Sequence, residues 1–150
     1  MVKDYQQAED LTQETFIKAF RKHYTFSHKS STKTWLFSIA QNTTKDFIRK
    51  RNPLRYYFSL SLSERDMSPL PHQMVEMNEQ EEILFHALQN LKPNYRQVII
   101  FRKLKEFSTR ETAEILGWSE SKVKSTLQRG IKDLKRNLIE GGIDYEATFR

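Results

Sequence analysis

The sequence has no cysteine, four glycines and four prolines among its 150 residues. The absence of thiols excludes a disulfide scaffold and a thiolate metal site, and it fits a reducing compartment. So few glycines leave no glycine-rich loop for phosphates. No apolar run approaches the roughly 20 residues that cross a bilayer, and the N-terminal stretch MVKDYQQAED is too polar for a signal peptide. We therefore predict a cytoplasmic protein with no direct membrane insertion.

Histidines are also scarce, and their spacing does not favour catalysis or metal binding. They lie far apart in the chain, at His23, His28, His72 and His86. Glu81 and Glu82 are adjacent at the expected start of a helix, where the helix dipole explains them better than acid–base chemistry does. We predict no enzyme activity, no metal site and no cofactor.

Basic residues are concentrated in two blocks. Residues 1–52 and 102–136 each hold ten Lys or Arg and five Asp or Glu, so each block has a net charge of +5. Residues 53–101 and 137–150 each have a net charge of −2. Two basic blocks around a mildly acidic middle are typical of a protein with two separate contacts on one polyanion.

Hydrophobic periodicity predicts helices only. Apolar residues recur at spacings of three and four, without the alternation typical of strands. The expected helices cover residues 4–22, 31–51, 77–91, 93–104, 108–117 and 119–134. The first helix has an apolar stripe of Ala8, Leu11, Phe16, Ala19 and Phe20. We predict an all-α fold.

The expected helix at 31–51 has an apolar side and a basic side. Its inward residues are Trp35, Leu36, Ile39, Ala40, Thr43 and Phe47. Its outward residues are Lys33, Gln41, Asn42, Lys45, Arg49 and Lys50. Trp35 is assigned to the core because it shares the inward stripe with Ile39.

Residues 107–134, FSTRETAEILGWSESKVKSTLQRGIKDL, predict a helix-turn-helix. Ser108 and Glu111 have the spacing of a capping box, and Gly117 can end the first helix in the left-handed conformation. The second helix presents cations and short polar side chains on its outer face, as Lys122, Lys124, Ser125, Gln128, Arg129 and Lys132. Such a face suits phosphates and base edges in a major groove, although a solvated surface would look the same.

Two longer stretches carry a family resemblance. The segments AEDLTQETFIKAF (8–20) and KTWLFSIAQNTTKDFIRKR (33–51) resemble regions 2.2 to 2.4 of bacterial sigma factors of the extracytoplasmic function (ECF) group. Residues 91–136 resemble region 4 of the same family. The resemblance implies two small helical domains joined by an extended linker: 1–52 (region 2-like), 53–76 (linker), 77–140 (region 4-like) and a tail at 141–150.

The family normally carries a further helical segment before the AEDL motif, and here only MVKDYQQ precedes it. Either Met1 is an internal methionine of a longer reading frame or the chain is naturally short. We expect residues 1–52 to be marginally stable alone, because so small a unit buries little surface.

The resemblance also implies three groups of site residues. Those expected to bind core polymerase are Asp10, Gln13, Glu14 and Phe16. Those expected at the −10 element are Phe26, His28, Lys29, Lys33, Asn42, Lys45 and Arg49. Those expected at the −35 element are Arg102, Ser121, Lys122, Lys124, Ser125, Gln128 and Arg129.

The function that the resemblance implies is promoter recognition for RNA polymerase. The expected partners are core RNA polymerase, through its β′ coiled coil and β flap, promoter DNA and an anti-sigma factor. One alternative is a stand-alone helix-turn-helix regulator that binds duplex DNA. Another is an interaction protein whose basic faces meet an acidic partner.

Overall fold

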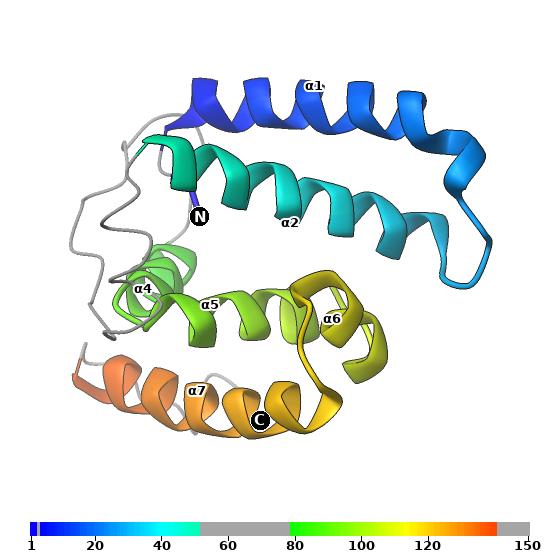
Figure 1. Ribbon diagram of the computed structural model, residues 1–150. Coiled ribbons are helices and arrows are strands. Elements are labelled where there is room, and N and C mark those ends of the chain that lie inside the picture. The colour runs from blue at the N-terminus through cyan, green and yellow to red at the C-terminus, as the bar shows by residue number, and fades with distance from the viewer. Residues whose placement is uncertain (3, 52–78, 141–150) are drawn as a thin grey trace.

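The computed structural model describes residues 1–2, 4–51 and 79–140, and within those ranges every regular element is helical (Figure 1). The elements are α1 (Tyr5–Lys22), the 3-10 helix η1 (His23–Thr25), α2 (Thr32–Arg51), α4 (Glu79–Gln89), α5 (Pro93–Ile99), the π-helical turn η2 (Ile100–Leu104), α6 (Thr109–Leu116) and α7 (Glu120–Glu140). The all-α prediction is confirmed. The expected linker at 53–76 and the tail at 141–150 lie outside the described residues.

Helices α1 and α2 form an antiparallel pair (Figure 1). Asp4 begins α1, because its carboxylate accepts a hydrogen bond from the Gln7 backbone N–H at 2.9 Å. On α1 the buried residues are Leu11, Thr15 and Ala19. Phe16 and Phe20 of the predicted apolar stripe are 60% and 78% exposed. In the described chain α1 packs mainly on α2, so only a narrow stripe of it is covered.

The C-terminal helices share one core. Leu88, Leu91, Val98, Ile99, Ala113 and Val123 are buried together, and Leu127, Ile131 and Leu134 of α7 pack against them. The periodicity that predicted an inward face for α7 is therefore confirmed. Helices α5 and α7 approach closely at Gly130, where an added Cβ would lie 3.1 Å from Tyr95 Cβ.

The predicted caps are present at both ends of α6. The Ser108 hydroxyl accepts from the Glu111 N–H at 3.1 Å, and Glu111 Oε2 accepts from the Ser108 N–H at 2.8 Å. Gly117 ends the helix with φ of 69°. Another cap was not predicted: the buried Arg96 guanidinium donates to the carbonyls of Gln89 and Leu91, at 3.0 and 3.2 Å.

The two halves of the chain pack against each other through α2 and α6. Figure 1 shows the order α1, α2, the α4–α6 group and α7 from one side of the molecule to the other. The expected outward position of Gln41 is wrong, because Gln41 is 4% exposed. The basic and polar side of α2, which sequence analysis assigned to solvent, is partly covered by the C-terminal half.

Candidate nucleic-acid interface

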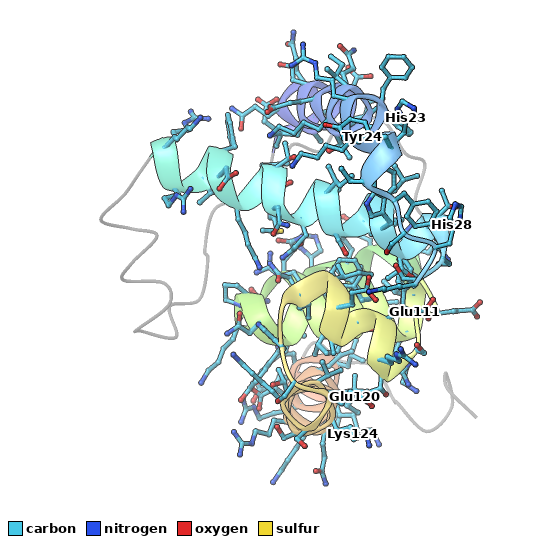
Figure 2. The ribbon with its side chains drawn as sticks, turned by 45° about the vertical axis from the view of Figure 1, so that its right-hand side comes forward. His23, Tyr24, His28, Glu111, Glu120 and Lys124 are labelled. Atoms are coloured by element: carbon cyan, nitrogen blue, oxygen red, sulfur yellow. The ribbon has the colours of Figure 1, made fainter. Side chains whose placement is uncertain are left out.

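The outer face of α7 brings together most of the residues expected at the −35 element. Ser121, Lys122, Lys124, Ser125, Gln128 and Arg129 are all exposed. Val123, which is fully buried, and Leu127 hold the opposite face of the helix in the core. Figure 2 shows Glu120 and Lys124 on α7, on the far side of the molecule from α1. The Lys122 ammonium lies 4.4 Å from the centre of the Trp118 ring, a contact that fixes the first turn.

Arg102 does not join this group. It lies in η2, and its half-buried guanidinium donates a hydrogen bond to the Phe107 carbonyl. That bond ties the turn between α5 and α6, where Glu106 has a positive φ of 58°. Arg102 therefore has a structural role in this turn, whereas its expected role at the −35 element stays a prediction.

Three rings meet in tilted geometry where the loop after α1 joins α2. The Phe26 ring centre is 4.4 Å from that of His28 and 5.0 Å from that of Trp35. Phe26 and Trp35 are half-buried, whereas His28 and Lys29 are exposed. His28 has φ of 55°, in the left-handed region that few non-glycine residues adopt. Figure 2 shows His28 projecting from this loop. An outward ring on a ring platform is the geometry that stacks with an unpaired base.

The basic residues expected at the −10 element on α2 fall into two sets. Asn42 and Arg49 are exposed, and Arg49 is paired with Asp46 at 2.8 Å. Lys33 and Lys45 instead contact the C-terminal half, since their ammonium groups donate to the carbonyls of Lys105 and Leu116, each at 3.2 Å. Burial and the nearby Lys122 ammonium lower the pKa of Lys45.

The residues expected to bind polymerase, Asp10, Gln13, Glu14 and Phe16, are all exposed on α1. Glu14 forms an ion pair with Lys18 at 2.7 Å. Sequence analysis did not single out Tyr24, which follows α1 in η1 and is 78% exposed, as is Phe20. The spacing of four from Phe16 to Phe20 places these two rings on one side of α1.

Within the described residues, no group of three or more His, Cys, Asp or Glu side chains could hold a metal ion. No helix in that part of the chain is both long and apolar enough to span a bilayer.

Comparison with known proteins gives the family. Residues 1–53 match the model for Sigma-70 region 2, and residues 81–134 match the model for Sigma-70, region 4. The chain is 38% identical over 143 residues to ECF RNA polymerase sigma factor SigX of Bacillus subtilis (strain 168), covering 92% of this chain and 74% of SigX. The chain belongs to the ECF group of sigma-70 factors.

Two further similarities support the same family. ECF RNA polymerase sigma factor SigM of Bacillus subtilis (strain 168) is 35% identical over 149 residues, covering 97% of this chain and 88% of SigM. Among solved structures, the sigma factor RpoE of Bartonella quintana, crystallised with the anti-sigma factor NepR, has a TM-score of 0.69 and 29% identity. That match covers 91% of this ECF chain and 84% of RpoE.

Proposed function

We propose that this ECF sigma factor acts in the cytoplasm and directs core RNA polymerase to promoters by reading the −10 and −35 elements, with no catalytic chemistry of its own. The observation that carries the proposal is the order of the two family regions together with the exposed polar and basic face of α7. We assign residues 1–52 to a region 2-like domain, 53–76 to a linker, 77–140 to a region 4-like domain and 141–150 to a tail.

At the −35 element, α7 is the proposed reading helix. Lys122, Lys124 and Arg129 would contact phosphates, and Ser121, Ser125 and Gln128 would meet base edges in the major groove. The buried Val123 keeps the helix fixed to the domain, so the reading side chains have a rigid support.

At the −10 element, the proposed contacts come from the loop before α2 and from α2 itself. The Phe26 and His28 rings, which are tilted against each other, would accept an unpaired base, with Lys29 near its phosphate. Asn42, Lys45 and Arg49, together with Lys33, would follow the backbone of the open strand.

Two protein partners are proposed. The acidic and aromatic face of α1 would bind the β′ coiled coil of core polymerase, with the α7 domain near the β flap. The structure of this chain is similar to that of RpoE, which was crystallised with the anti-sigma factor NepR. This similarity supports an anti-sigma partner for this chain as well.

The decisive experiment is reconstitution with Bacillus subtilis core RNA polymerase. This enzyme is chosen because the relatives SigX and SigM are RNA polymerase sigma factors of that bacterium. We expect the full chain to co-elute with the core enzyme and to start transcripts from a genomic fragment library. A footprint on duplex DNA by the chain alone, without binding to the core enzyme, would instead support a stand-alone regulator.

A further inference from the structure

Trp118 lies in the turn between α6 and α7, and both its main chain and its side chain are fixed there. It follows Gly117, where α6 ends, and its backbone N–H donates to the Ala113 carbonyl at 2.9 Å. Its half-buried side chain packs against the hydrophobic cluster that contains Val123 and against the one that contains Leu116. Side chains packed in this way stay in one rotamer, so the indole ring has a defined orientation at the start of α7.

The Lys122 side chain lies over the face of this ring. Its ammonium is 4.4 Å from the ring centre, inside the roughly 6 Å over which an aromatic face attracts a cation. Tryptophan attracts cations more strongly than tyrosine or phenylalanine does. The main chain of Lys122 is fixed as well, because its N–H donates to the Ser119 hydroxyl at 3.2 Å. Both ends of the Lys122 side chain are therefore held in the first turn of α7.

The partner of Lys122 is a neutral ring and not a carboxylate. Arg136, near the other end of α7, is paired instead with the Asp133 carboxylate at 3.3 Å. In the part of the chain that the structure describes, no carboxylate forms an ion pair with Lys122. A phosphate would have to displace a carboxylate partner, whereas a ring can keep its contact while the ammonium binds the phosphate. Lys122 is thus ordered by a partner that does not compete with DNA.

The other cations proposed to contact phosphates from this face have no such support. Lys124 and Arg129 are exposed, and among the described residues neither side chain has a hydrogen bond, an ion pair or a ring contact. A mobile lysine or arginine loses rotamer entropy when it is ordered on a phosphate, and this loss reduces the affinity. Lys122 has lost part of this freedom already, so its binding to a phosphate costs less.

We propose that Trp118 is a positioning residue for DNA binding, because its ring holds the Lys122 ammonium ready for one phosphate of the −35 duplex. The inference rests on the proposed function for the place of α7 on DNA. Trp118 acts through Lys122 and needs no contact of its own with a base or a phosphate.

The contact can be observed in the free chain by NMR. The ring current of an indole shifts protons above its face to higher field, so we expect the Hε protons of Lys122 to lie upfield of those of Lys124. Trp118→Leu keeps an apolar side chain but removes the aromatic face, and it should abolish the shift while helix content by circular dichroism stays unchanged. Equal positions for the two lysines in the parent chain would overturn the contact and the inference with it.

A double-mutant cycle measures whether the ring acts through Lys122. The probe is a fluorescein-labelled duplex recovered from the transcription library, and the protein is the full chain assembled with core RNA polymerase. We expect Trp118→Leu to weaken binding about two- to fivefold, the effect that a cation–π contact at an exposed site supports. In the Lys122→Gln background, Trp118→Leu should have almost no further effect.

Two more variants separate positioning from a purely structural role. Trp118→Phe keeps an aromatic face and should restore most of the affinity that Trp118→Leu loses. Arg129→Ala is the matched control: Arg129 lies about two turns along α7 from Lys122, so its effect should add to that of Trp118→Leu. If leucine at this position lowers the helix content, Trp118→Met serves in the same cycle, because methionine adapts to irregular packing.

The outcomes separate this inference from the proposed function. Additive effects of Trp118→Leu and Lys122→Gln, or no recovery in Trp118→Phe, would overturn the positioning role and leave α7 on the duplex. Weaker binding in Arg129→Ala with no effect of Lys122→Gln would do the same. If neither change affects binding, or if the parent complex binds no recovered duplex, the proposed place of α7 on DNA is wrong and this inference is wrong with it.

Discussion

Glu111 uses its two carboxylate oxygens for two different tasks. Oε2 accepts from the Ser108 N–H and completes the cap of α6, whereas Oε1 accepts from the Thr34 hydroxyl of α2. Hydrogen bonds from the Ser108 backbone, from its hydroxyl and from Thr34 lower the pKa of Glu111. Glu111 therefore caps α6 and at the same time contributes a hydrogen bond to the contact between the two halves.

The lowered pKa predicts an acid-dependent loss of stability. A carboxyl group with a lower pKa in the folded state contributes stability above its unfolded pKa, and this contribution is lost as the pH falls through the folded value. The free energy of unfolding should decline below about pH 4.5, and Glu111→Gln should flatten this decline while costing under about 1 kcal/mol at neutral pH, since glutamine also fits a capping box. Urea unfolding between pH 3 and 7 measures both effects. An equally steep decline in the variant would contradict the assignment.

Single substitutions on α7 should affect either the affinity for DNA or the preference for particular bases, depending on the side chain that is removed. Arg129→Ala should weaken binding to all −35 sequences alike and reduce the salt dependence, as expected for a phosphate contact. Gln128→Ala should change preference at one or two positions, by about 1–3 kcal/mol at the affected base pair. Binding of the chain, assembled with core RNA polymerase, to a duplex library that is sequenced before and after selection distinguishes these results. If Lys124, Ser125 and Gln128 can all become alanine without effect, α7 is not the reading helix.

At the scale of elements, the approach of α5 to α7 depends on one missing side chain. A Cβ at Gly130 would meet Tyr95 Cβ at 3.1 Å and Tyr95 Cα at 3.4 Å, and neither atom can swing aside. Alanine favours a helix over glycine by about 1 kcal/mol, but overpacking costs about 1–3 kcal/mol.

We therefore expect Gly130→Ala to lower the free energy of unfolding by about 1 kcal/mol. Lys132→Ala, an exposed change on the same helix, should have almost no effect. Chemical denaturation of both variants tests the expectation. A stabilised Gly130→Ala would show that α5 shifts easily against α7.

The exposed face of α1 gives a second prediction for an element. Replacing Asp10 and Glu14 by lysine should weaken binding to core polymerase at least tenfold while helix content stays unchanged, because both carboxylates are exposed. Replacing the exposed Glu106 and Glu114 by lysine makes the same change in net charge elsewhere and should preserve binding. A pull-down with core enzyme compares the two. Equal affinity for both variants would mean that the α1 face is only solvated.

At the scale of the whole molecule, the sequence predicted the helices and their caps well but missed the contact between the two halves. Periodicity detects an apolar stripe, and Leu11 or Val123 follow one. The side of α2 that faces α6 is built from Thr34, Gln41 and Lys45, which resemble solvated residues in a sequence. Phe16 and Phe20 lie on the predicted apolar stripe of α1 and are exposed. Hydrophobicity measures the cost of contact with water and does not show which partner covers a helix.

The left-handed backbone of His28 limits how this loop can diversify. With φ of 55°, the position accepts glycine, asparagine or aspartate readily, whereas β-branched side chains would be strained. A new preference at the −10 element, acquired through position 28, would have to come from a short list of residues. Random replacement there should return few functional proteins containing Val, Ile or Thr, even though the side chain points into open solvent. In the proposed −10 role of this loop, the main chain would thus restrict the evolution of promoter choice before any base is contacted.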